Sequence, residues 1–198
     1  MATISFNPAL TTQPQSSFLL QTEGYVQGAF MDDPSSRMYL AGGSLDSALA
    51  QPVWPGMAIA EYIPTVNSNQ VGSTIKLATA ETDLTGFNVG NQNYNAIITP
   101  GNTVQQLGPL QTVMYFRLGS GARIVVQADS ALVTAAENGL ISQQVQWDFT
   151  NQKLIAYTTG TALNVKVLSF NSNSKIVSYN SGTGAVTWTT GAAAVIQL

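Results

Sequence analysis

The chain has 198 residues, neither cysteine nor histidine, a formal net charge of −3 at pH 7, and charged side chains at only 9% of its positions. These absences exclude a disulfide framework, a thiolate nucleophile and the commonest general base and metal ligand, so we expect no enzyme and no cofactor. The seven lysines and arginines form no basic stripe, which predicts no nucleic-acid partner, and the neutral polar surface is suited to packing against other proteins.

Residues 1–22 carry no charged side chain and are expected to form an extended N-terminal arm. Its apolar residues have little reason to stay in water, so we predict that the arm lies on a partner; they are Phe6, Leu10, Phe18, Leu19 and Leu20. A frayed terminus or an ordinary first strand is the alternative. The start lacks the features of a secretory signal and no apolar run reaches about 18 residues, so we expect synthesis in a cytoplasm and no membrane partner.

Residues 23–99 predict a first β lobe. Its clearest stretch is PVWPGMAIAEYIP (residues 52–64), in which prolines and a glycine punctuate a strand of alternating large and small apolar residues, and Trp54 is the expected core anchor. Further strands are expected at residues 23–30 and 74–79. Residues 44–50 predict a single helical turn, with Ser44 as its cap.

The loop at residues 81–93 contains several oxygen ligands in a glycine-containing segment, which raises the question of a calcium site. The ligand spacing does not match an EF-hand. We therefore expect no metal, and we expect Asn88, Asn91 and Asn93 to hydrogen-bond the backbone of their own loop.

Residues 100–198 predict a C-terminal β-barrel or sandwich lobe that follows a Pro/Gly-rich break. Residues 112–118 and 122–128 read as a hairpin, and residues 129–139 as one short helix with Ser130 as its cap. Six strands are expected after it, with Trp147 and Trp188 as core anchors; they span residues 140–147, 153–157, 162–170, 175–179, 185–189 and 192–198.

Two of these segments repeat one pattern. VQWDFTNQKL and VSYNSGTGAV align over ten positions at an offset of 32 residues, with Trp147 opposite Tyr179 and Asp148 opposite Asn180. We interpret the match as one hairpin geometry used twice, with Asp148 and Asn180 nucleating the two turns, because a repeat protein would show at least three units.

Three segments, PVWPGMAI, VQWD and the small-then-apolar AAAVIQL, together resemble the capsid cement or decoration proteins of tailed bacteriophages. The resemblance implies a mainly β virion protein without catalytic, cofactor or metal sites. Such a protein binds the outer surface of the assembled capsid and bridges neighbouring major capsid proteins against the pressure of packed DNA. We expect a two-lobed antiparallel β-sandwich or barrel, jelly-roll-like, with one or two short helices. Symmetry favours a homodimer, with a homotrimer as the alternative.

Two other function classes stay open. A phage tail or fibre protein, or another carbohydrate-binding β module, would share this composition and would stack Trp54, Trp147 or Trp188 on sugar rings, although tryptophan is more often part of a core. A hydrolase that uses only carboxylates would draw on Glu61, Glu137 or Asp148, none of which has a recognisable partner in the sequence.

Overall fold

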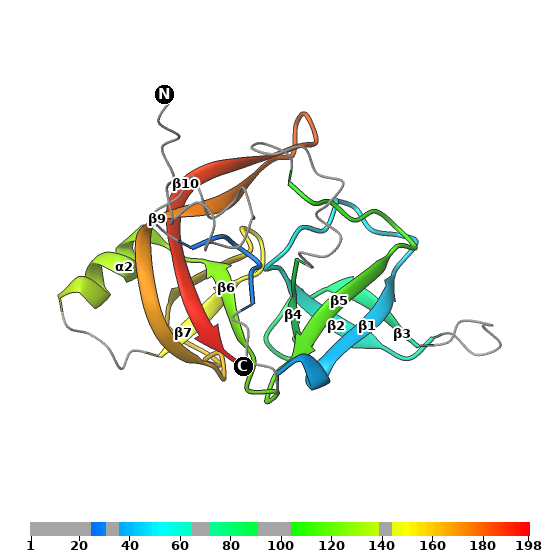
Figure 1. The fold of residues 1–198 in the computed structure, drawn as a ribbon, viewed down its shortest axis with the longest axis horizontal. Coiled ribbons are helices and arrows are strands. Elements are labelled where there is room, and N and C mark those ends of the chain that lie inside the picture. Colours follow the sequence, from blue (N-terminus) through cyan, green and yellow to red (C-terminus); the bar gives the residue numbers. More distant parts are fainter. Residues whose placement is uncertain (1–24, 31–35, 65–71, 91–103, 139–143) are drawn as a thin grey trace, which may run out of the picture.

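The computed structural model describes residues 25–30, 36–64, 72–90, 104–138 and 144–198 (Figure 1). Most of its regular structure is β-strand, so the expected mainly β, barrel-containing fold is confirmed. A 3₁₀ turn, η1 (Ser36–Tyr39), leads into a closed five-stranded barrel, in the order β1 (Leu40–Leu45), β3 (Ser73–Leu77), β2 (Ala58–Tyr62), β4 (Gly86–Asn88) and β5 (Thr112–Arg117). The barrel pairs are antiparallel except β1 with β3, which run parallel.

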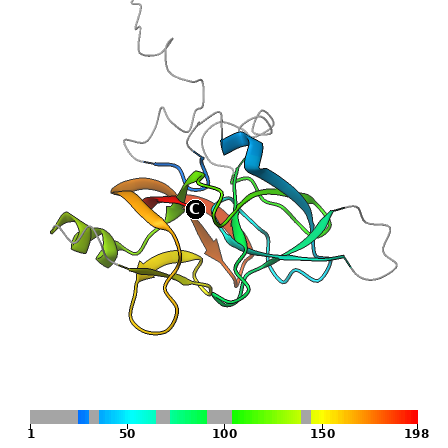
Figure 2. The ribbon, with the colours of Figure 1, turned by 90° about the horizontal axis from the view of Figure 1, so that it is seen from below.

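The rest of the chain forms a second group of strands beside the barrel (Figures 1 and 2). Its three-stranded sheet has the order β6 (Arg123–Gln127), β10 (Ala185–Gln197), β9 (Lys166–Asn180). A separate hairpin pairs β7 (Val145–Asp148) with β8 (Lys153–Ala156), and the helix α2 (Ser130–Glu137) connects β6 to it in the chain.

The alternating pattern of residues 57–60 places two different cores on the two faces of β2. Met57 and Ile59 point into the barrel, where they join Leu45, Ile75 and Val113 in the barrel core. The alternate residues of β2 are alanines, and they face a second cluster, the interface core, that lies between the barrel and the second group of strands. Small alanine side chains let that second group approach the barrel closely.

Two buried side-chain amides hold distant segments of the chain together. Gln152 accepts a hydrogen bond from the backbone N–H of Ala58 at 2.9 Å and so ties the β7–β8 turn to the barrel. Asn88 accepts from the Met57 N–H at 2.7 Å and donates to the Trp54 carbonyl at 2.9 Å, which fixes the turn that precedes β2. Both amides are almost fully buried, and such groups are costly unless they are paired.

The long β9–β10 hairpin belongs to both groups. Its residues near Phe170 and Ala194 lie in the interface core, whereas Val177 and Val186, nearer its tip, lie in the barrel core beside Trp54. Figure 1 shows the hairpin curving from the sheet toward the barrel. The two groups therefore share one continuous structural element.

The structure corrects several local predictions. The strands at 112–118 and 122–128 exist but do not pair with each other: β5 closes the barrel on β1 and β4, and β6 pairs with β10. The barrel thus takes its fifth strand from beyond residue 99, where the first lobe was expected to end.

The helical turn expected at residues 44–50 does not form. Ser44 belongs to β1, and the turn that follows is made by Asp46, whose carboxylate accepts from the Ala48 N–H at 2.7 Å. Of the strand expected at 23–30, the described part, residues 25–30, shows only isolated bridges at Val26 and Phe30. The arm (residues 1–22) lies outside the described residues.

Four of the six strands predicted after the helix merge into two. Residues 166–180 are one continuous strand, and so are residues 185–197. The expected turn at 171–174 is a local irregularity, in which the Asn171 carboxamide accepts from the Asn173 N–H. The second expected break, at residues 190–191, is a register shift between Gly191 and Ala193 within the continuous strand. Glycine and small residues are found in β-bulges as well as in turns, so the same sequence pattern fits both.

Candidate functional site

The two repeated turns have the predicted geometry. The Asp148 carboxylate accepts from the backbone N–H groups of Thr150 and Asn151, at 3.0 and 2.9 Å. The Asn180 carboxamide accepts in the same way from Gly182 and Thr183. Each turn also contains one residue with a positive φ at the equivalent position, Gln152 (φ 53°) in the first and Gly184 (φ 70°) in the second.

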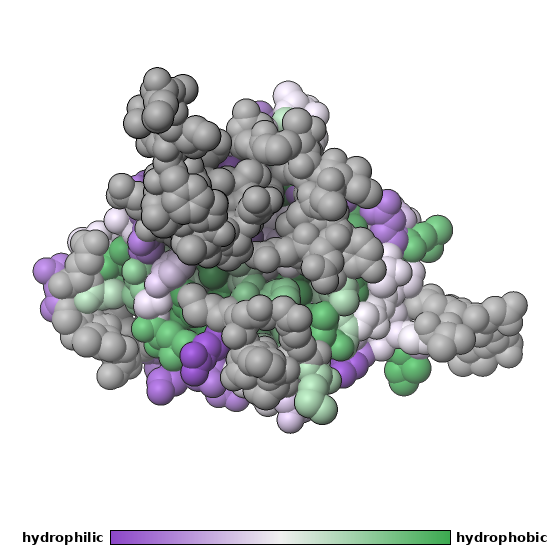
Figure 3. All heavy atoms as spheres, viewed as in Figure 1, coloured by the Kyte–Doolittle hydropathy of each residue, from purple (hydrophilic) through white to green (hydrophobic). Residues whose placement is uncertain are grey.

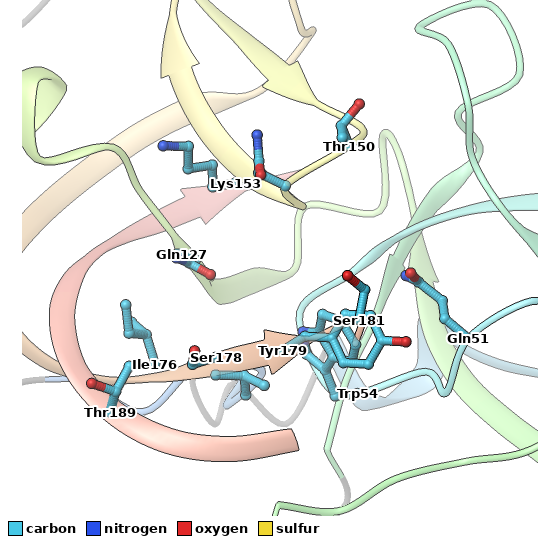
Figure 4. A pocket seen from close by; sticks show the side chains of 12 residues that line it. Gln51, Trp54, Gln127, Thr150, Lys153, Ile176, Ser178, Tyr179, Ser181 and Thr189 are labelled. Carbon is cyan, nitrogen blue, oxygen red and sulfur yellow. The ribbon is translucent and has the colours of Figure 1, made fainter. Parts of the chain in front are cut away.

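Between these two turns and the barrel lies a cleft of about 620 Å³. Figure 4 shows Thr150 and Lys153 on one side of it, with Trp54, Tyr179 and Ser181 across from them. Three parts of the fold thus meet here: the barrel entrance, the β7–β8 turn and the β9–β10 hairpin. The remaining lining residues come from the same elements and from β6; they are Gln51, Gln127, Asn151, Ile176, Val177, Ser178 and Thr189.

Aromatic rings form one wall of the cleft. The rings of Trp54 and Tyr179 pack together with centroids 5.3 Å apart and an interplanar angle of 38°. Trp54 is buried, whereas Tyr179 is partly exposed. The indole N–H of Trp54 is buried without a hydrogen-bond partner among the described residues, an arrangement that ordinarily costs about 1–3 kcal/mol.

The charges beside the cleft neutralise each other. The Lys153 ammonium lies 2.6 Å from an Asp129 carboxylate oxygen. The hydrogen bond from Lys153, together with one from the Ala131 N–H, lowers the pKa of Asp129, so the Asp129 carboxylate stays ionised at neutral pH. The lining therefore offers hydroxyl groups, amides and aromatic surface rather than net charge.

A second hollow of about 570 Å³ adjoins the cleft, and Gln51 and Thr150 line both. It runs along the outside of the barrel, past Leu49, Leu77 and Phe149. The ion pair of Lys76 with Asp46, 3.4 Å apart, lies in its lining.

A compact ionic cluster sits on a different part of the barrel. Arg117 makes two hydrogen bonds of 2.7 Å to the Glu61 carboxylate, which also accepts from the Ser73 hydroxyl. The Arg117 contact, partly opposed by burial, lowers the pKa of Glu61 to about 2. Burial and the neighbouring Glu61 raise the pKa of Tyr115. A carboxylate held ionised in this way is suited to bracing the barrel rather than to proton transfer.

The predicted site residues are distributed as follows. Trp54 and Trp147 are buried in the barrel core and the interface core respectively, and Trp188 is half-buried with its ring near the Lys175 ammonium. The buried tryptophans present no open face to a sugar. Glu61 is committed to Arg117 and Asp148 to its own turn, and no group of three or more potential metal ligands occurs among the described residues.

The prediction for the loop at 81–93 was wrong for Asn88, which bonds to the distant 54–57 turn because it points into the core. It is Asp83 that caps its own loop, by accepting from the N–H groups of Thr79 and Ala80. Glu81 accepts from the Trp147 N–H. Asn91 and Asn93 lie outside the described residues.

The sequence reasoning missed Tyr179 and Gln127 as residues of the cleft. A signal for Tyr179 was present, since it aligns with Trp147 in the repeated hairpins, but only the fold shows that the second hairpin turns its aromatic ring toward Trp54. Nothing in the sequence marks Gln127.

No family model, no curated protein and no solved structure matches this chain. Within the described ranges, no helix has the length and apolar character needed to cross a membrane.

Proposed function

We propose that this protein decorates the outer surface of a tailed-phage capsid, where it bridges neighbouring copies of the major capsid protein and stabilises the shell. The observation that carries the proposal is a surface with little free charge. It is joined by the resemblance of three sequence segments to phage cement proteins.

Among the described residues, most of the few charged side chains make ion pairs or hydrogen bonds within the molecule. Arg117, Lys153 and Lys76 are paired with carboxylates. Lys175 is buried, and its ammonium lies over the Trp188 ring. Figure 3 shows hydrophilic residues in small separate groups on the coloured part of the visible face, with pale and hydrophobic areas between them. Such a surface gains little from Coulomb attraction and resists dissociation by salt.

Large apolar side chains add to this surface. Ile63 is 91% exposed, Met38 86% and Leu110 71%. Single exposed apolar residues are common on any protein, but together with the missing charge they suit contact with a protein partner. The uncharged arm, with Phe6, Leu10, Phe18, Leu19 and Leu20, supplies further apolar contacts in this proposal.

The test is co-sedimentation with empty, expanded shells assembled from the major capsid protein of the phage whose genome encodes this chain. We expect the protein to pellet with the shells and to stay bound from about 0.05 to 1 M NaCl, although the Debye length falls to about 3 Å at the upper end. Because the chain has no histidine, its own charge is expected to stay nearly constant between about pH 6 and 8. Failure to pellet would refute the decoration role, and steep loss with salt would refute the neutral interface.

The same assay tests the arm. A chain that lacks residues 1–22 is expected to keep its β-sheet circular dichroism but to bind shells more weakly or to lose self-association. Light scattering after gel filtration would distinguish the favoured homodimer from a homotrimer. Undiminished binding and unchanged mass in the truncated chain would remove the arm from the proposal.

A further inference from the structure

We propose that the cleft between the two repeated turns binds a neutral saccharide, with Tyr179 as the stacking platform. This inference does not depend on capsid binding, because the cleft belongs to the free chain. Its size of about 620 Å³ falls within the ordinary range for small-molecule sites, and it lies where three parts of the fold meet, as such sites often do.

Tyr179 has the features that a sugar platform needs. A pyranose ring presents a face of C–H groups that packs well on an aromatic ring, provided the ring is held in place. Trp54 backs the Tyr179 ring at 5.3 Å, and Trp54 is itself fixed in the barrel core. The platform is thus rigid yet partly exposed, which no buried tryptophan of this chain offers.

Hydroxyl and amide groups line the same cleft as Tyr179 and can serve as hydrogen-bond partners for sugar hydroxyls. The side-chain amides of Gln51 and Gln127 line the cleft and make no side-chain hydrogen bond to any other residue in the described parts of the chain. The hydroxyl groups of Ser178 and Thr189 line it as well. Amides can donate and accept at once, which matches the dual character of a sugar hydroxyl.

The charge balance decides between neutral and anionic ligands. Lys153 is the cationic side chain of the lining, and its ammonium is held by Asp129 at 2.6 Å. An anion would have to compete with that carboxylate and lie close to it. A neutral saccharide incurs no such penalty, so the cleft favours neutral over anionic ligands.

The neighbouring hollow extends the site. Gln51 and Thr150 line both hollows, so the two adjoin at these residues, and a ligand longer than the first hollow can reach the second. Leu49 and Phe149 give the second cavity apolar surface of its own. We therefore expect disaccharides and longer chains to bind more tightly than the corresponding monosaccharides.

The experiment is a titration of the full chain with five neutral disaccharides: maltose, cellobiose, lactose, mannobiose and diacetylchitobiose. Binding is followed by heat and by amide chemical shifts up to about 10 mM sugar, since dissociation constants of about 1 mM or below are expected. The anionic 3′-sialyllactose serves as the charged comparison. We expect at least one neutral probe to bind and to shift the amides of residues 178–181 and 150–151.

Variants locate the site. Tyr179→Ala is expected to weaken binding about tenfold or more, and Tyr179→Phe to retain it because the ring face is kept. Gln127→Ala removes an amide without touching the aromatic pair, so it reports on the site even if Tyr179→Ala disturbs folding. The matched control is Tyr62→Ala, which removes an exposed tyrosine of β2 outside the cleft.

Four results would overturn the proposal. They are no binding to any neutral probe, binding of the sialylated sugar alone, affinity unchanged in both Tyr179→Ala and Gln127→Ala, and an equal loss in Tyr62→Ala.

Discussion

Gln152 holds the β7–β8 turn to the barrel, and the loss of stability on removing its side chain can be predicted from its hydrogen bonds. The Gln152 side chain accepts from the Ala58 N–H at 2.9 Å and the Trp147 indole N–H at 3.3 Å, and it donates to the Phe149 carbonyl at 2.8 Å. The residue is 2% exposed, so water cannot easily replace it. Gln152→Ala leaves these groups unpaired. At about 1–3 kcal/mol for each fully buried group, and less for the longer contact, we expect a loss of about 2–4 kcal/mol.

Gln152→Gly separates the amide from the backbone. Gln152 has a φ of 53°, a conformation that disfavours side chains by about 1–2 kcal/mol, and Gly184 stands at the equivalent position of the second hairpin. Both variants lose the amide, but the glycine variant relieves the backbone strain. It should therefore be about 1 kcal/mol more stable than the alanine variant.

The assays are equilibrium unfolding in urea and thermal unfolding, each followed by tryptophan fluorescence and circular dichroism. For a chain of this length each kcal/mol corresponds to about 2–4 °C in Tm. Gln106→Ala, at an exposed position, is the matched control and should change stability by less than about 0.5 kcal/mol. If Gln152→Ala were as stable as Gln106→Ala, the amide would not hold the turn to the barrel.

Three further predictions concern other parts of the fold. Trp54→Ala should cost about 3–5 kcal/mol because the ring fills the barrel core, and unchanged thermal stability would contradict that role. The folded-state pKa of Glu61, about 2 against an ordinary 4.5, means that its contribution is full above pH 4.5 and is lost as pH falls toward 2. Glu61→Gln should therefore be less stable at pH 7 and lose less Tm across that range, and parallel Tm profiles would contradict the assignment. Gly28→Ala would place its Cβ 2.0 Å from that of Pro55 and should destabilise far more than Gly119→Ala, which has a similar positive φ and open space around it. Equal urea midpoints for the two variants would show that the clash is relieved elsewhere.

Local chemistry in the sequence predicted the elements that depend on neighbouring residues. The short helix at 130–137 forms where expected and ends at Asn138, although its cap is Asp129 rather than Ser130. The twin turns follow from Asp148 and Asn180, since their hydrogen bonds span only two or three residues. These features need no knowledge of the rest of the chain.

Pairing between distant segments could not be predicted in the same way. Residues 112–118 and 122–128 have the pattern of a hairpin, yet β1 and β10 outcompete them as partners because those pairings build two separate cores. The cleft has the same origin: Trp54 and Tyr179 are far apart in sequence, and neither residue's own surroundings indicate the other. Single-sequence patterns determine which face of a strand is apolar, but not which surface it will cover.

The sharing of the β9–β10 hairpin between the two cores has a consequence for synthesis on the ribosome. The last barrel strand ends at Arg117, but the barrel core also needs Val177 and Val186, which are translated at least 60 residues later. During that interval Trp54 and Met57 lack part of their cover and present apolar surface to chaperones or to other nascent chains. Long-range closure of this kind also folds slowly. We infer that the barrel is translated first but completed last.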